Sequence, residues 1–148
     1  DFSVRPNVFL AYYFNKDILS KAEWERSFDK VIDVCYLSWG GFSSVSKNDS
    51  RFKSFHTGMS NESYHNGDSW FFVNNIAAIC MFDLNKEKYS KYVNRIFEAS
   101  LFERDNFGFL GVCAEISNAD SLSSKGCFCQ AWSEATLFEL SLVLGKPL

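Results

Sequence analysis

The alternation of apolar and polar positions along the chain predicts five helices. In two of them apolar residues recur every three or four positions, which is typical of amphipathic helices with one buried face. The others are apolar on nearly every side, which is typical of helices buried by several neighbours. The predicted helices cover residues 6–15, 21–37, 69–82, 86–102 and 130–144. The predicted fold class is therefore all-α.

Local signals mark where several of these helices begin and end. Pro6 suits a first helical position, and Ser20 with Glu23 has the spacing of a capping box. Asn85 is placed to cap the fourth helix, and Gly145 to end the fifth. These signals favour separate helices with short connections on one side.

Two connections are much longer than the others. They cover residues 38–68 and 103–129, while the first-to-second and third-to-fourth links are only a few residues. Loops of this length usually carry function. In a succession of antiparallel helices both would lie at the same end, so we expect the functional site there. Five helices do not close a symmetric layer, and we expect them to be part of a larger helical assembly.

Composition removes several classes of function. The 148 residues carry a net charge of −3 with no basic block, so we expect no nucleic-acid partner and no anionic membrane partner. No apolar run reaches the roughly 18–20 residues of a membrane span. Five irregularly spaced cysteines argue against a disulfide scaffold and favour a reducing, cytoplasmic setting. The chain begins at Asp1 rather than Met, so we expect a piece of a longer protein, folded as one domain.

A dense polar cluster, SYHNGDSWFFVNN at residues 63–75, ends the first long connection. Its polar groups run directly into large aromatic side chains, a combination suited to a polar, flat-faced ligand such as a sugar. Gly67 would allow close backbone approach, and Trp70 would offer a face for a sugar ring. The candidate substrate-binding residues here are Tyr64, His65, Asn66, Gly67, Asp68 and Trp70.

The second long connection carries a candidate general base. Glu115 lies between small residues in a loop expected at the same end, and a carboxylate there could activate a water molecule. Asp120 is a weaker candidate for the same task. Gln130 and Trp132 open the fifth helix much as Asp68 and Trp70 open the third, and we add them to the substrate-binding set.

Each of these residues also has an ordinary structural interpretation. Asp68 or Ser69 could simply cap the third helix, and His65 could be a structural histidine. A lone glutamate such as Glu115 is often a solvated surface residue, and the sequence around Asp120 has the composition of a turn.

A metal site is the remaining chemical alternative. Cys127 and Cys129, with Cys113, His56 and His65, could supply ligands, but their spacing matches no zinc pattern. The chain has no phosphate loop and no nucleotide fingerprint. We therefore expect no metal and no cofactor.

With these motifs identified, the chain resembles the C-terminal part of the amylo-alpha-1,6-glucosidase region of glycogen debranching enzymes. Three stretches carry the resemblance, in the order of that family. They are VRPNVFLA (4–11), the segment from WGGFSSVSKND to YHNGDSWFFVNNIAA (39–78), and the segment from CAEISNAD to KGCFCQAWSEATLFEL (113–140). Bacterial members often carry Thr where Asp68 stands, which argues against Asp68 as an essential acid.

The resemblance implies that residues 1–148 are the C-terminal portion of one (α/α)6 toroid, with alternating inner and outer helices. It implies an inverting hydrolase that removes α-1,6-linked glucose from glycogen or limit dextrin. Its general base corresponds to Glu115, and Arg5 and Asn7 join the substrate-binding set. Its general acid lies before Arg5, outside this chain, so the missing upstream part of the same protein is an expected partner. We therefore expect this chain alone to be inactive.

Two other functions are open at this point. One is another glycosidase on the same toroid, of the glucoamylase or trehalase type, which product analysis would distinguish. The other is a glucan-binding module that kept the pocket without the chemistry. An acidic residue in the expected preceding segment would favour an enzyme over a binding module.

Overall fold

The computed structural model describes residues 2–148, which form a mostly helical structure. The all-α prediction is therefore confirmed. A two-stranded antiparallel sheet, which the pattern of apolar residues did not predict, joins the two long connections. The α-helices are α1 (Asn7–Phe14), α2 (Lys21–Cys35), α3 (Phe71–Asn106) and α4 (Ala131–Leu144), and the strands are β1 (Ser69–Trp70) and β2 (Ile116–Ser117).

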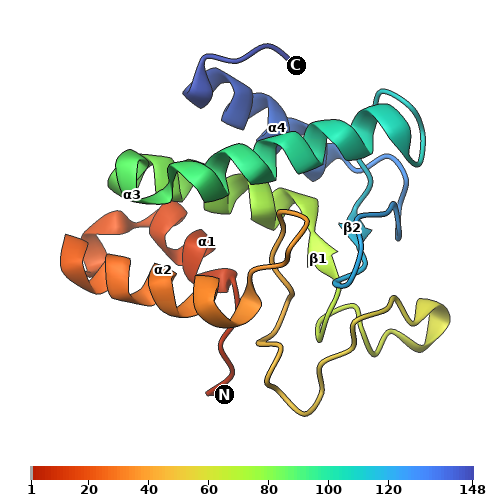
Figure 1. The fold of residues 1–148 in the computed structure, drawn as a ribbon, viewed down its shortest axis with the longest axis horizontal. Coiled ribbons are helices and arrows are strands. Elements are labelled where there is room, and N and C mark those ends of the chain that lie inside the picture. The colour runs from red at the N-terminus through yellow and green to blue at the C-terminus, as the bar shows by residue number, and fades with distance from the viewer. Residues whose placement is uncertain (1) are drawn as a thin grey trace.

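The third and fourth predicted helices appear as the two halves of α3. They meet at Asn85, whose backbone is not helical (φ −162°, ψ 85°). The Asn85 side chain accepts a hydrogen bond from the backbone N–H of Lys88, which is the predicted cap. The chain reverses there, so the two halves lie side by side (Figure 1), and Ser100 donates to Asn75 across the contact.

Two other predicted helix ends are confirmed, and one is wrong. Ser20 and Glu23 form the capping box of α2, and Gly145 ends α4 in the left-handed conformation (φ 63°). At the start of α3 no side chain caps the helix, and Trp70 is the residue before it. Neither Asp68 nor Ser69 caps α3, because Ser69 and Trp70 belong to strand β1 instead.

The main core lies where α1, α2, α3 and α4 pack together. In Figure 1, α3 lies between the α1–α2 pair and α4. Aromatic rings fill the contact of the first two helices with α3, and Phe9 lies 4.6 Å from Phe28 between ring centroids. The largest fully buried side chains of this core include Phe9, Phe28, Phe42, Met81, Tyr89, Ile96, Leu137 and Leu140.

A second, smaller core lies beneath the long connections. Trp39, from the first connection, packs near Phe71 and donates through Nε1 to the carbonyl oxygen of Ala119 in the second. The carbonyl oxygen of Ser54 accepts hydrogen bonds from the backbone N–H groups of Ala119 and Asp120. The prediction that both long connections lie at the same end is therefore confirmed.

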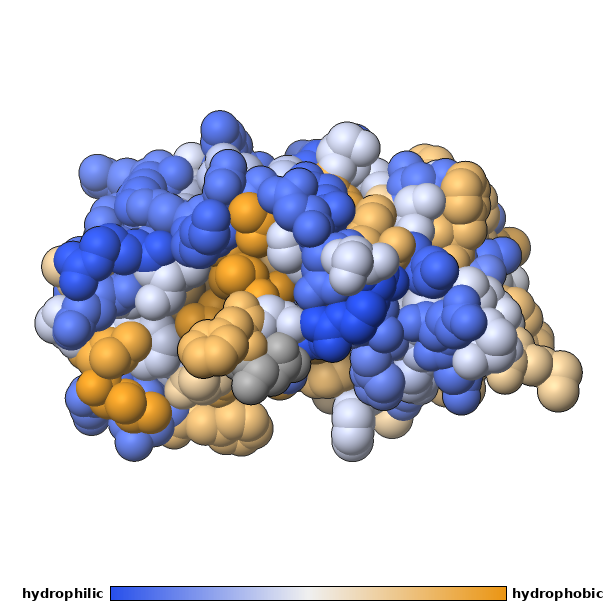
Figure 2. All heavy atoms as spheres, turned by 90° about the horizontal axis from the view of Figure 1, so that it is seen from below, coloured by the Kyte–Doolittle hydropathy of each residue, from blue (hydrophilic) through white to orange (hydrophobic). Residues whose placement is uncertain are grey.

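Several large apolar side chains remain exposed on the outer faces of α1 and α4. Their exposed fractions are 80% for Phe14, 63% for Trp132 and 64% for Leu142. In the view from below, apolar side chains gather near the middle and the lower left of a mostly polar face (Figure 2). Within residues 2–148, no helix has both the length and the apolar character needed to cross a membrane.

Candidate active site

The two long connections meet at the sheet formed by β1 and β2. Ser69 pairs with Ser117 and Trp70 with Ile116 in an antiparallel register. Beside this pair, the first backbone N–H of α3, that of Phe71, donates to the carbonyl oxygen of Glu115 at 3.2 Å. The pairing therefore places Glu115 next to the start of α3, although Glu115 lies 44 positions after Phe71 in the sequence.

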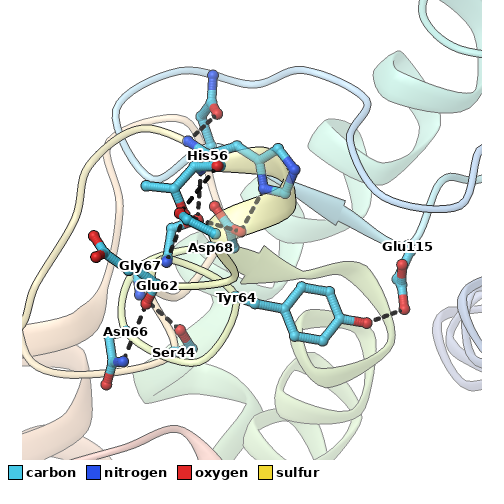
Figure 3. Close-up of polar contacts among 12 residues, drawn as sticks. Ser44, His56, Glu62, Tyr64, Asn66, Gly67, Asp68 and Glu115 are labelled. Carbon is cyan, nitrogen blue, oxygen red and sulfur yellow. Dashed lines mark hydrogen bonds and ion pairs between the residues drawn. The ribbon is translucent and has the colours of Figure 1, made fainter.

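The carboxylate of Glu115 is held by three donors. Oε1 accepts the Tyr64 hydroxyl at 2.5 Å and the Gln130 amide at 3.4 Å, and Oε2 accepts the backbone N–H of Cys127 at 3.0 Å. Figure 3 shows Tyr64 pointing toward this carboxylate. Glu115 is only partly buried. Because a carboxylate can accept about four hydrogen bonds, these three leave a position for a water molecule.

Gly126 lets the chain pass close to this carboxylate. Its φ of +68° is in the left-handed region, where side chains other than glycine are strained. A Cβ atom at this position would also collide with Oε2 of Glu115. The positive φ therefore favours glycine here, and any larger residue would push the Glu115 carboxylate out of its position beside the Cys127 N–H.

Tyr64 stays protonated beside the carboxylate. Burial, together with the hydrogen bond to Glu115 and the negative charge of that residue, raises the pKa of Tyr64 to about 12. At neutral pH the phenol therefore keeps its proton and donates a short, charge-assisted hydrogen bond to Glu115. Such a bond fixes the orientation of the carboxylate.

Arg5 anchors the turn that carries Tyr64. Its guanidinium donates to the backbone carbonyls of Ser44 and His65 and to the side-chain oxygen of Asn66. Arg5 and Asn66 thus bind each other directly, which joins the start of the chain to the polar cluster.

An aromatic pocket of about 420 Å³ opens beside this turn. The ring of His65 is stacked on Trp70 with an interplanar angle of 9°, and Trp132 lies 5.3 Å from Phe72 between centroids. Five of the predicted substrate-binding residues line the pocket, namely Arg5, Asn7, His65, Trp70 and Trp132. Tyr64 and Gln130 are instead brought together at Glu115.

Asp68 does not face this pocket. Its side chain is fully buried, and Oδ2 accepts hydrogen bonds from the Ser63 hydroxyl at 2.9 Å and from Nδ1 of His56 at 2.7 Å (Figure 3). The other oxygen, Oδ1, is buried without a hydrogen-bond partner among the described residues. The sequence placed Asp68 against the substrate, but the structure places it under the loop, where it holds His56.

Gly67 also has a different role from the one expected. It lies buried against the backbone of Lys53, and a Cβ atom would collide with the carbonyl oxygen of that residue. Its N–H donates to the Ser44 hydroxyl at 2.9 Å. The close backbone approach that a glycine permits is therefore made to another part of the loop, rather than to a ligand.

Three side chains near the site were not found by sequence reasoning. His56 entered only as a possible metal ligand, and Glu103 and Glu134 did not enter at all. Both glutamates accept hydrogen bonds from backbone N–H groups just before Glu115. No spacing connects them to Glu115, because they lie in helices on either side of its loop.

The cysteines of the alternative metal site are dispersed. Cys113 is buried, while Cys127 and Cys129 are exposed, and all three are free thiols. Within residues 2–148, no three side chains of histidine, cysteine or acidic residues converge on a point that could hold a metal ion.

Comparison with known proteins identifies the family of the chain. Residues 1–139 match the protein family described as amylo-alpha-1,6-glucosidase, which is nearly the whole of the 148-residue chain. A search of curated proteins finds no match to the chain. The matched residues include every candidate contact described above, from Arg5 to Trp132. The chain therefore belongs to the amylo-alpha-1,6-glucosidase family, a glycoside hydrolase region of glycogen debranching enzymes.

Proposed function

We propose that this chain supplies the general base and part of the glucose pocket of an inverting glycosidase that removes α-1,6-linked glucose from branch stubs of glycogen or limit dextrin. The observation that carries the proposal is the carboxylate of Glu115. It is partly exposed, it is held by Tyr64, Gln130 and the Cys127 N–H, and it lies where the two long connections meet.

In this mechanism Glu115 takes a proton from a water molecule that attacks the anomeric carbon. A carboxylic acid on the other side of the sugar protonates the leaving oxygen, and an inverting pair stands roughly 6.5–9.5 Å apart. We place that acid in a segment of the same protein that precedes Arg5. Residues 1–148 would then be inactive alone and would act together with that segment.

The exposed apolar faces support a larger domain. α1 and α4 are apolar on nearly all sides, yet they expose Phe14, Phe138 and Leu142. Such helices are stable when neighbours cover them. We propose that further helices of the same toroid cover these faces.

The substitution Glu115→Gln in the complete protein tests the proposed function. Gln keeps the size and the hydrogen-bonding capacity of Glu115 but is not a base, so we expect glucose release from a phosphorylase limit dextrin to fall by about 10²- to 10⁴-fold. Binding of the dextrin should be retained, and the wild-type product should be released first as β-glucose.

Asp120→Asn is the matched control, because Asp120 is an exposed carboxylate of the same loop. It should leave the rate unchanged. If Glu115→Gln retains the wild-type rate, the base lies elsewhere. If the wild-type protein binds dextrin and releases no glucose, the chain belongs to a binding module.

A further inference from the structure

Glu103 is a buried carboxylate to which no role has been assigned. It lies in the last turn of α3, and its side chain is fully buried. Glutamate is almost never fully buried unless it is paired, because removing a carboxylate from water is unfavourable. Its partners therefore indicate what the position is for.

Both partners of Glu103 belong to the connection that carries Glu115. The backbone N–H of Ala114 lies 3.3 Å from Oε1 and 3.4 Å from Oε2, and the Ser124 hydroxyl donates to Oε1. Burial raises the pKa of Glu103, while the hydrogen bonds from Ser124 and Ala114 act in the opposite direction. Glu103 thus joins the two sides of the loop. One partner, Ala114, directly precedes Glu115, and the other, Ser124, directly precedes Lys125, which pairs with Ile116.

A second carboxylate acts on the preceding residue. Glu134, in the first turn of α4, accepts the backbone N–H of Cys113, and the N–H of Gln130 donates to the Cys113 carbonyl at 2.9 Å. The N–H of Glu115 itself donates to the Cys127 carbonyl at 2.8 Å. All three N–H groups of residues 113–115 therefore have acceptors, and two of these are carboxylates from different helices.

We propose, on the basis of the proposed function, that Glu103 is a positioning residue for the general base. It fixes the Ala114 peptide and the Ser124 side of the loop, and so it holds the carboxylate of Glu115 at the distance that the attacking water requires. The effect of such a residue falls on the rate of the chemical step rather than on substrate binding, because a misplacement of about 1 Å costs on the order of 10²-fold in rate.

A carboxylate suits this position better than an amide. Both oxygens of Glu103 accept hydrogen bonds, one of them from two donors. A glutamine would replace one oxygen by an NH₂ group, which cannot accept. Glu103→Gln therefore keeps the volume of the side chain and removes part of the hold on Ala114.

The test is Glu103→Gln in the complete protein, with kcat and KM measured on a phosphorylase limit dextrin. We expect kcat to fall by about 10- to 100-fold, with KM changed by about twofold or less. Amide hydrogen exchange should become faster at Ala114 and Glu115. Ser124→Ala removes a single hydrogen bond, so it should give a smaller fall in kcat and keeps the test open if Glu103→Gln does not fold.

Asp83→Asn is the matched control. Asp83 also lies in α3 and accepts two hydrogen bonds, from the Tyr12 hydroxyl and from Lys16. It lies near the break at Asn85, however, whereas the site lies at the start of α3. It should lower the melting temperature and leave kcat unchanged.

An unchanged kcat in Glu103→Gln and Ser124→Ala, or an equal fall in Asp83→Asn, would overturn the positioning role. If the wild-type protein releases no glucose, the proposed function fails, and hydrogen exchange at Ala114 alone decides whether Glu103 holds the loop.

Discussion

The two long connections meet at one site but are stabilised in different ways. The first contains a buried run from Trp39 to Val45, and Ser63, Gly67 and Asp68 are buried at its end. In the second, every residue from 120 to 130 is at least partly exposed. The residue with the candidate chemistry, Glu115, lies in this second connection.

A reactive carboxylate can therefore be exposed to solvent and still be held in one position. The first connection is packed by its own side chains and by Arg5, so it can serve as a rigid wall that carries Tyr64. In the second, the backbone N–H groups of Cys113 and Ala114 donate hydrogen bonds to Glu134 and Glu103 in the helices, while residues 120–130 contribute no buried side chain. Substitutions in the first should therefore change mainly stability, and substitutions in the second mainly rate.

After Glu115→Gln itself, the largest effect should come from Gly126→Ala in the second connection. The new methyl group would displace the Glu115 carboxylate, and we expect kcat to fall by on the order of 10²-fold. The positive φ should in addition cost about 1–3 kcal/mol of the free energy of unfolding. Glucose release and denaturant unfolding would measure the two effects.

Gly58→Ala separates these two effects. Gly58 has a similar φ of +58°, but it lies in the first connection, and an added Cβ there would meet no other atom within 4 Å. The Gly58→Ala variant should lose about as much unfolding free energy as Gly126→Ala and should keep its activity. Equal losses of activity in the two variants would remove the distinction between the connections.

His56→Ala should change stability rather than rate. Without His56, the buried carboxylate of Asp68 keeps only the Ser63 hydroxyl, so we expect a loss of about 1–3 kcal/mol in the free energy of unfolding. His65→Ala is the control for the unfolding measurement only, because His65 is exposed and lines the pocket instead. A fall in kcat with unchanged stability would instead place His56 within the reacting site.

The smallest effect should come from Tyr64→Phe, which breaks the link between the two connections. We expect kcat to fall by about tenfold or less, since the other two donors to Glu115 remain. The pKa of Tyr64 is raised from 10 to about 12 in the folded protein, so between pH 10 and 12 the folded state binds more protons than the unfolded state. The free energy of unfolding therefore falls as the pH rises through this range. In Tyr64→Phe it should fall less, because the contribution of Tyr64 is gone.

Tyr13→Phe is the control for the alkaline effect. The hydrogen bond from Tyr13 to Glu139 and burial raise the pKa of Tyr13 to about 12 as well, but Tyr13 lies at the end of α1 away from Glu115. Tyr13→Phe should make the alkaline fall in the free energy of unfolding smaller by a similar amount, and it should leave kcat unchanged. Unfolding at a series of pH values from 9 to 12 would measure both variants.

The helices and the meeting of the two long connections could be predicted from the sequence. Apolar spacing, the Ser20–Glu23 box and the cap at Asn85 are local signals, and the structure contains all of them. Local signals failed at the start of α3, where a carboxylate before an aromatic run has the appearance of a helix cap. Pairing with residues 116–117 made that segment a strand instead.

The helical fold, the end of the molecule that holds the candidate site, and the choice of Glu115 and Tyr64 as candidates all follow from local patterns of residues. The folded structure was needed to show that Asp68 is buried under the loop, that Gly67 packs against Lys53, and that Glu103 and Glu134 accept hydrogen bonds from the residues before Glu115. The physical reason is that hydrogen bonds in helices and caps join neighbours with a fixed spacing. Contacts between buried side chains and distant peptide groups have no period, so they arise only when the packed helices bring the loops together.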